Sequence, residues 1–465
     1  MSTPVSAFAD ASAIAGITVF PGKLYPPFAP EIEAYDVDLP LGAAGFSLSI
    51  APKSPDARVH IDGVAVRLTT VPRGTTTRVE VTDESGATTL VTMRSRPPKQ
   101  TAYVKASNPD VGDGFGVALA ISADGSALAV GAPGEDGKSL GAGGKQTDNK
   151  RVDSGAVYVY SRAGESWRFD GYVKSRLPAH GFGAAVALSS DGKLLAVGEP
   201  DEDSGATGSG AVEIFERQRR GWRHVTLVKP REPTRGGGFG ASVALSWDTL
   251  VVGAPGEDAA YLVSRKRAWR TVERVAGAPA GERFGEAVSL GADGTTLAVS
   301  GEVTTRVYTQ TKAGMREVLT LPGQRGVVSG SGHVVAAIEP ARDCVHVYRN
   351  GEHGWFAAAQ FPGAGERLAL DFAGNALVIG NAVDRFNYRG GARVFRWDGK
   401  AWLPGEPLIA ANASANDLGG VAVTIDARGE TVVVGAPGED GAGAELSGDP
   451  GTDSIESSGA AYVFR

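Results

Sequence analysis

The sequence predicts an all-β protein, a seven-bladed β-propeller preceded by a small β-sandwich domain. Three observations support this fold class. The chain has 465 residues, of which 65 are Gly and 26 are Pro, yet 42% are hydrophobic, so turns are dense while apolar cores remain available. Short apolar segments recur with the same residues at their ends. The first hundred residues lack that signature but alternate apolar and polar residues in short runs, as half-buried strands do.

The strongest observation is the repetition. Five segments start with Phe-Gly or a related pair and continue as an apolar strand. In four of them an Asp follows nine residues after the Phe, and three of these Asp residues precede a Gly, the strongest short signal for a hairpin turn. The pairs that start these segments are Phe115-Gly116, Phe182-Gly183, Phe239-Gly240, Phe284-Gly285 and Leu418-Gly419.

Each repeat continues in the same order. A second apolar strand ends in Gly-Ala-Pro or a variant, at Gly131, Gly198, Gly253 and Gly435. A third strand and an aromatic-led fourth strand follow. Two further repeats, starting near Gly326 and Arg367, keep the strands but have lost the signature. Residues 98–465 thus hold seven repeats of about 53 residues, and four short strands per repeat predict propeller blades.

The two ends of the repeat region predict how the ring closes. The last repeat stops after its third strand, at Arg465, and an unassigned strand, Thr101–Ser107, precedes the first Phe-Gly. We expect Thr101–Ser107 to supply the missing fourth strand of the last blade and so to cover an exposed sheet edge.

Residues 13–97 predict a β-sandwich, because strands such as FSLSIAP and TRVEVTD alternate between turn signals at Asp62-Gly63 and Ser85-Gly86. We expect residues 1–12 to be disordered. Arg96-Pro97-Pro98-Lys99-Gln100 predicts a short, stiff linker.

The ordered recurrence of Phe-Gly, Gly-Ala-Pro and an aromatic strand resembles the FG-GAP repeats of integrin α-subunit propellers and of their bacterial relatives. The resemblance covers about four-fifths of the chain, and it implies a seven-bladed propeller with a ligand-binding loop face. The compact Asp124-Gly125 and Asp191-Gly192 turns are closer to the bacterial type, and they are too short for integrin calcium loops. The N-terminal segment resembles bacterial cadherin-like domains that accompany surface repeats.

The loops between second and third strands carry the candidate binding residues. Acidic residues follow Gly-Ala-Pro in repeats 7, 1, 2 and 3, which are contiguous in a closed ring. The ligand-binding candidates are Glu135, Asp136, Asp201, Asp203, Glu257, Asp258, Glu439 and Asp440. The metal candidates are Asp136, Asp148, Asp153, Asp440, Asp449 and Asp453, because Ca²⁺ prefers several carboxylate oxygens on flexible loops. The acids can also serve only to keep the propeller soluble.

Other function classes have little support in the sequence. The net charge of −7 argues against nucleic-acid binding, and no apolar segment is long enough for membrane insertion. The single Cys344 excludes an internal disulfide and a multi-thiolate metal site. The six histidines are scattered, without the His-x-x-x-His spacing, which argues against a histidine-based metal site or catalytic triad.

We therefore expect a non-catalytic recognition or adhesion protein that is not an enzyme. It would bind a protein or glycan ligand through the propeller's loop face, with Ca²⁺ as the one candidate cofactor. An extracellular or cell-surface location is expected from the resemblance, although no signal peptide is visible, and a cytoplasmic location is the alternative. Two other functions remain open: a hydrolase or lyase with its site in the central funnel, and an assembly protein that pairs through a sandwich edge.

Overall fold

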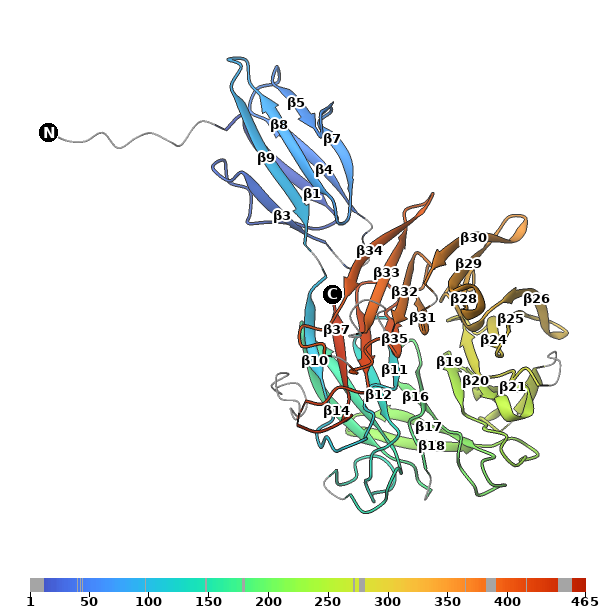
Figure 1. Cartoon of the computed structure of the whole chain (residues 1–465). Helices are drawn as coiled ribbons and strands as arrows, with labels where there is room; N and C mark the ends of the chain where they lie inside the picture. Colours follow the sequence, from blue (N-terminus) through green and yellow to red (C-terminus); the bar gives the residue numbers. More distant parts are fainter. Residues whose placement is uncertain are drawn as a thin grey trace. The chain divides into compact units, whose positions relative to one another are not determined.

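The computed structural model describes residues 12–39, 41, 43, 45–96, 98–146, 149–177, 180–270, 272–275, 281–363, 365–381, 390–414, 416–441 and 454–465. In these residues the chain is all-β, as predicted, with 37 strands and three short 3₁₀ turns (Figure 1). None of the described segments forms a helix with the length and apolar character needed to cross a bilayer. The expected disorder of residues 1–12 concerns a segment that lies, except for Ser12, outside the described residues.

The chain divides into two compact units, Met1–Lys99 with Arg396–Glu406, and Gln100–Phe395 with Pro407–Arg465. In the first unit, one sheet has the order β1-β4-β7 and the other β2-β3-β9-β8-β5-β6. The strands are β1 (Ile14–Phe20), β2 (Lys23–Tyr25), β3 (Ala34–Asp38), β4 (Gly45–Pro52), β5 (Arg58–Ile61), β6 (Val64–Ala65), β7 (Leu68–Pro72), β8 (Thr76–Thr82) and β9 (Thr88–Ser95).

Alternate side chains of these two sheets form one hydrophobic core. In β4, Phe46, Leu48 and Ile50 are buried while the serines between them are exposed, and in β8 Val79 and Val81 are fully buried. This period of two is what a strand with one buried face requires.

The described residues that follow Lys99 form seven four-stranded sheets. We number them in chain order. Sheet 1 is β11 (Ala118–Ile121), β12 (Ala127–Ala132), β13 (Ala156–Ala163) and β14 (Ser166–Val173); sheet 2 is β15 (Ala185–Leu188), β16 (Leu194–Glu199), β17 (Ala211–Gln218) and β18 (Gly221–Val228); sheet 3 is β19 (Ser242–Leu245), β20 (Thr249–Ala254), β21 (Ala259–Ser264) and β22 (Val272–Val275).

The remaining sheets repeat this order. Sheet 4 is β23 (Ala287–Leu290), β24 (Thr296–Ser300), β25 (Thr304–Thr311) and β26 (Gly314–Pro322); sheet 5 is β27 (Gln324–Val328), β28 (Val334–Glu339), β29 (Cys344–Gly351) and β30 (Gly354–Pro362); sheet 6 is β31 (Arg367–Leu370), β32 (Ala376–Asn381), β33 (Gly391–Trp397) and β34 (Trp402–Leu408); sheet 7 is β35 (Ala422–Ile425), β36 (Val432–Ala436), β37 (Ala460–Phe464) and β10 (Gln100–Val104). The 3₁₀ turns are η1 (Pro255–Glu257), η2 (Arg265–Arg267) and η3 (Pro340–Arg342).

Neighbouring sheets pack through their first strands. β11 contacts β15, β15 contacts β19, and the series continues through β35, which contacts β11. In sheet 7, β10 pairs antiparallel with β37, so the start and the end of this unit share one sheet. This arrangement of many four-stranded sheets is consistent with a β-propeller.

The Phe of each Phe-Gly lies between two sheets. Phe115, Phe182, Phe239 and Phe284 are fully buried. Phe182 also forms a parallel bridge to Gly155, at the start of the preceding sheet's third strand. The backbones approach so closely that a Cβ on Gly131 would lie 2.1 Å from the carbonyl oxygen of Gly183. Only glycine fits there, which explains the Gly of Gly-Ala-Pro.

The match of Leu418-Gly419 to Phe-Gly is wrong by one residue. Gly390 bridges Gly419 as Gly155 bridges Phe182, and the Gly420 N–H bonds to Gly435 as the Gly116 N–H bonds to Gly131. Gly419 therefore stands in the Phe position, and Leu418 is 39% exposed.

Candidate functional site

The predicted ligand-binding and metal residues lie in the loops that join the second strand of each sheet to the third. In sheet 1, Glu135 is 1% exposed and its Oε2 lies 2.5 Å from Lys174 Nζ, immediately after β14. Its carboxylate also accepts hydrogen bonds from Gly137 N and Asn108 Nδ2. Glu135 is therefore an internal ion-pair partner, because its oxygens are occupied by groups of the same protein.

Sheet 7 repeats this arrangement. Glu439 is 1% exposed, and its Oε2 lies 2.6 Å from Nζ of Lys105, which follows β10. Tyr103 and Asn412 donate to the other oxygen. Burial lowers the pKa of Lys105, and the neighbouring Glu439 carboxylate opposes that shift. In sheet 1, burial likewise lowers the pKa of Lys174 against the attraction of Glu135.

Sheet 2 holds a more open version of the pair. Glu202 Oε2 lies 2.5 Å from Lys229 Nζ, and the lysine side chain is 22% exposed. Asp201 and Asp203 are exposed on the same loop, where Asp203 Oδ1 accepts a hydrogen bond from Gly208 N.

The Asp that follows each Glu bonds within its own loop or to the next repeat. Asp136 Oδ1 accepts the Asp153 N–H, and Asp440 Oδ1 accepts the Ser457 N–H. Asp258 accepts the N–H groups of Gly281 and Phe284, so it joins sheet 3 to the Phe-Gly segment of sheet 4. Three metal candidates, Asp148, Asp449 and Asp453, lie outside the described residues. Calcium binding by these loops therefore stays a prediction.

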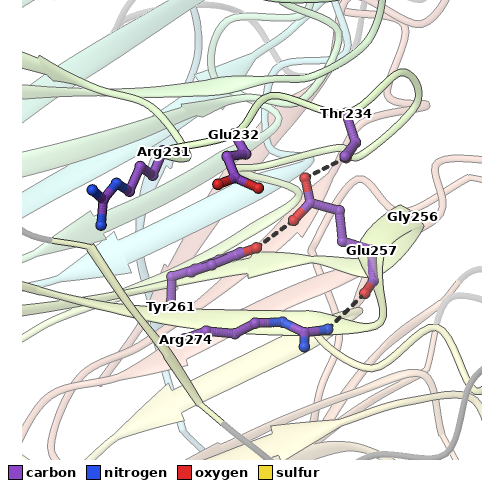
Figure 2. Close-up of a pocket in the computed structure, with 7 residues that line it drawn as sticks. All are labelled: Arg231, Glu232, Thr234, Gly256, Glu257, Tyr261 and Arg274. Carbon is purple, nitrogen blue, oxygen red and sulfur yellow. Dashed lines mark hydrogen bonds between the residues drawn. The ribbon is translucent and has the colours of Figure 1, made fainter.

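The loop of sheet 3 borders an open pocket of about 520 Å³. In sheets 7, 1 and 2 a Lys follows the fourth strand, whereas Ala276 follows β22, so the sequence has no lysine there to pair with Glu257. Figure 2 shows that Glu257 instead accepts hydrogen bonds from Thr234 and Tyr261. The pocket is lined by Arg231, Glu232, Thr234, Gly256, Glu257, Tyr261 and Arg274.

The pocket presents charges of both signs to solvent. Burial and the hydrogen bond to Glu257 raise the pKa of Tyr261 to about 12, so its hydroxyl remains a donor near neutral pH. Arg274 Nη2 donates to the backbone carbonyls of Glu257 and Asp258. Within the described residues, the side chains of Arg231 and Glu232 make no hydrogen bond or ion pair and are exposed. The pocket thus offers one guanidinium and one carboxylate to a ligand.

A comparison with family models finds the FG-GAP repeat in residues 222–266. Residues 222–266 are an FG-GAP repeat. The match runs from β18 through Phe239-Gly240 to η2, and it contains every residue that lines the pocket except Arg274. It covers one of the predicted repeats, so the bacterial integrin-like type and the cadherin-like N-terminal domain stay predictions.

Comparison with curated proteins finds no match. Among solved structures, similarity is found to a periplasmic gluconolactonase of Pseudomonas aeruginosa, with 17% identity over 71% of this chain and 91% of that chain and a TM-score of 0.46. Hydrazine synthase of Kuenenia stuttgartiensis has 15% identity over 71% and 94%, with a TM-score of 0.46. A putative 6-phosphogluconolactonase of Bacteroides fragilis has 12% identity over 65% and 88%, with a TM-score of 0.44.

These neighbours contradict the expectation that the chain is not an enzyme. A gluconolactonase and a putative 6-phosphogluconolactonase are among the three structures, so the expectation that the chain is not an enzyme is wrong as an inference from the fold. At this identity and TM-score, the similarity assigns no activity to this chain.

Sheet 2 also holds a buried polar cluster that the sequence analysis missed. Glu199 and Glu213 are both fully buried, and Ser175 Oγ donates to Glu213 Oε1 at 2.7 Å and lies 3.1 Å from Glu199 Oε2. His224 Nε2 lies 3.0 Å from Glu213 Oε2. Burial and the nearby Glu213 charge raise the pKa of Glu199 to about 9, so it holds a proton at neutral pH.

Proposed function

We propose that the chain is a recognition protein that binds a carboxylate-bearing ligand in the open pocket of sheet 3. In this proposal residues 98–465 form a seven-bladed FG-GAP propeller of the bacterial type, and residues 13–97 form a cadherin-like β-sandwich that spaces it from its attachment. The resemblance to surface-type repeats supports an extracellular or cell-surface adhesion role.

The observation that carries the proposal is the different use of one glutamate position in the repeat. In sheets 1 and 7 this Glu forms an ion pair with a buried lysine, so its carboxylate is shielded from solvent. In sheet 3 Glu257 is held by two hydroxyl groups beside an open pocket. A binding face needs such an open loop, and the groups that this pocket offers to a ligand are the side chains of Arg231 and Glu232 rather than the hydrogen-bonded Glu257.

The charges of the pocket support the class of ligand. Arg231 is exposed at the rim without a partner among the described residues, and a guanidinium matches a carboxylate through two parallel N–H donors. Glu232, likewise without a described partner, can accept hydrogen bonds from hydroxyl or amide groups of the same ligand. A glycan with an acidic sugar and a protein segment with an Asp or Glu side chain both present this chemistry.

The test is binding of the full chain to two arrays, one of neutral and acidic glycans and one of peptides with and without acidic residues. We expect binding to acidic members of one array, and Arg231→Ala should weaken it about 10-fold or more, as expected when a charged hydrogen bond is lost. Arg267→Ala is the matched control, because Arg267 is an exposed arginine of the same sheet at the other end of β21.

Equal binding of neutral and acidic members, or equal loss in the Arg231 and Arg267 variants, would contradict the proposal. Bound glycans should also be recovered and weighed by mass spectrometry. A changed mass would show that the pocket turns its ligand over as well as binding it.

A further inference from the structure

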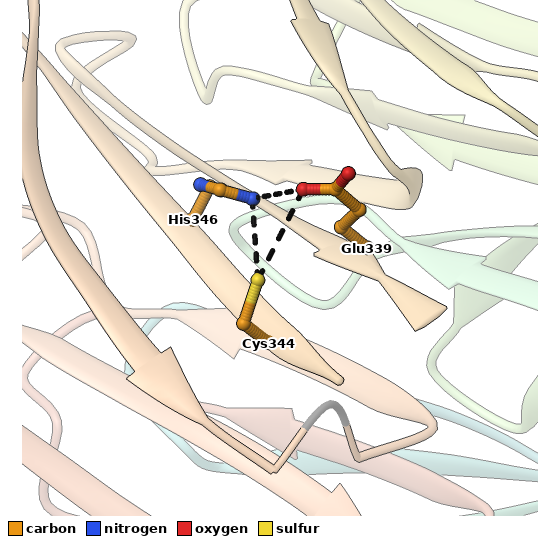
Figure 3. Close-up of side chains that lie close together, drawn as sticks. All are labelled: Glu339, Cys344 and His346. Carbon is orange, nitrogen blue, oxygen red and sulfur yellow. Dashed lines mark hydrogen bonds and ion pairs between the residues drawn. The ribbon is translucent and has the colours of Figure 1, made fainter. Parts of the chain in front are cut away.

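Sheet 5 brings the only cysteine of the chain together with a histidine and a glutamate. Glu339 is the last residue of β28 and pairs directly with Cys344, the first residue of β29. His346 is two residues farther along β29. Side chains two apart on a strand share a face, and directly paired residues of adjacent strands share it too. The hairpin register therefore places all three side chains on one face, as Figure 3 shows.

The three polar atoms converge on one centre. His346 Nε2 lies 2.6 Å from Glu339 Oε2 and 3.3 Å from Cys344 Sγ, and Sγ lies 4.0 Å from Oε2. Zinc bonds of 2.0–2.3 Å in tetrahedral geometry place neighbouring ligand atoms about 3.3–3.6 Å apart. The observed separations bracket this value, so small side-chain movements suffice to admit a metal ion.

The same distances argue against a catalytic relay. A Cys-His-Glu relay requires the carboxylate to bond to one ring nitrogen and the thiol to face the other. Here Sγ and Oε2 both face Nε2. A single ring N–H cannot donate well to both, whereas one cation can be bound by all three atoms once the thiol is deprotonated.

The equivalent positions in sheets 1, 3 and 7 show that the fold does not need these residues, although sheet 2 carries Glu199 and Glu213 at the positions of Glu339 and His346. Glu339 corresponds by ladder register to Ala132, Ala254 and Ala436, and Cys344 corresponds to the alanines paired with them. His346 corresponds to Tyr158, Tyr261 and Tyr462. Sheet 5 thus replaces an Ala, Ala and Tyr set with three metal-ligating groups.

We propose that Glu339, Cys344 and His346 bind a divalent transition-metal ion, Zn²⁺ in the first place. Thiolate and imidazole ligands select Zn²⁺ over Ca²⁺ and Mg²⁺, which prefer oxygen. Three protein ligands leave a fourth position for water or a ligand group. Cys344 is 2% exposed and the other two side chains about 15%, so the site is shielded yet open to an ion. Arg342 Nε, 3.4 Å from Glu339 Oε1, orients the carboxylate.

The sequence argues against a histidine-based metal site because two patterns are missing, a His-x-x-x-His pair and several cysteines. Neither pattern covers a mixed set whose members meet because a hairpin pairs position 339 with 344.

The experiment is titration of the metal-free full chain with Co²⁺, a spectroscopic substitute, and with Zn²⁺ by calorimetry. We expect one equivalent of Co²⁺, with a thiolate-to-cobalt charge-transfer band in the near ultraviolet. Cys344→Ala and His346→Tyr introduce the residues that other sheets carry, so both should fold. Each should remove the band or weaken Zn²⁺ binding at least about 100-fold. His353→Ala, an exposed histidine in the β29–β30 turn, should change neither.

Absence of the charge-transfer band in the wild-type chain, or unchanged Zn²⁺ affinity in Cys344→Ala, would overturn the proposal. A second measurement needs no variant. Because Cys344 is the only cysteine, the rate of its alkylation reports directly on the site. Zn²⁺ should slow alkylation at least about 10-fold and Ca²⁺ should not; equal rates with and without Zn²⁺ would also overturn it.

Discussion

The loop after the second strand buries its glutamate in sheet 1 and leaves it beside an open pocket in sheet 3. Sheet 1 buries Glu135 with Lys174, and both side chains are at most 2% exposed. Sheet 3 keeps Glu257 beside an open pocket, with hydroxyl donors in place of the ammonium group. The two loops share the Gly-Ala-Pro-Gly-Glu-Asp sequence, but they differ in two respects: the long segment 133–155 joins β12 to β13 where only 255–258 joins β20 to β21, and a Lys follows the fourth strand in sheet 1 where an Ala follows it in sheet 3.

The comparison shows that the same glutamate position of the repeat carries a buried ion pair in some copies and borders an open pocket in another. In sheet 1 the Glu135 carboxylate is paired with Lys174 and hydrogen-bonded to other groups of the protein, so it is not open to a ligand. The strands themselves do not differ, because the ladder registers of β20–β21 and β12–β13 are the same around Gly-Ala-Pro.

The largest effect is expected when the buried pair of sheet 1 is broken. Lys174→Met leaves the Glu135 carboxylate without its cation in a dry environment, which should lower the free energy of unfolding by about 3–5 kcal/mol. Denaturant unfolding measures it. The double variant Lys174→Met, Glu135→Gln should recover part of the loss. A loss below about 1 kcal/mol in the single variant would show that the pair is not dry.

The buried cluster of sheet 2 predicts a pH effect of intermediate size. Glu199 has a pKa of about 9 in the folded chain, above its unfolded value near 4.5, so the folded state holds the extra proton between these pH values. Stability is therefore lost as the pH rises from about 5 to 9, and it levels off above that range. Glu199→Gln has no such proton to lose.

The difference between wild type and Glu199→Gln should change in favour of the variant by at least about 2 kcal/mol between pH 6 and 9. Denaturant unfolding at several pH values measures it, and Glu216→Gln, a change at a partly exposed glutamate of the adjacent strand β17, is the control. A difference that stays constant with pH would contradict the raised pKa of Glu199.

The smallest effect concerns Ca²⁺ in the loops of sheets 1 and 7. If these loops bind Ca²⁺, millimolar concentrations should release or absorb heat and stabilise the chain by about 1 kcal/mol at five times the dissociation constant. Asp136→Asn and Asp440→Asn should reduce the heat. Its absence in the wild-type chain would remove calcium from the account.

Local, repeated features were predictable, and long-range pairings were not. The Phe-Gly and Gly-Ala-Pro signatures indicated the sheets because each reflects a nearby steric need, such as the contact of Gly131 with Gly183. The Lys174 partner of Glu135 was missed because it is 39 residues away and an isolated lysine looks like a surface residue. The Glu339, Cys344 and His346 cluster depends on hairpin register, which the sequence alone does not reveal.

The central claim is that one glutamate position carries a buried ion pair in sheet 1 and only hydroxyl hydrogen bonds beside an open pocket in sheet 3. The most direct measurement compares the unfolding free energies of Glu135→Gln and Glu257→Gln in otherwise identical chains. The account predicts a loss of about 3 kcal/mol or more for Glu135→Gln, which leaves Lys174 buried without its anion, and about 1 kcal/mol or less for Glu257→Gln. Equal losses, or a larger loss at Glu257, would contradict it.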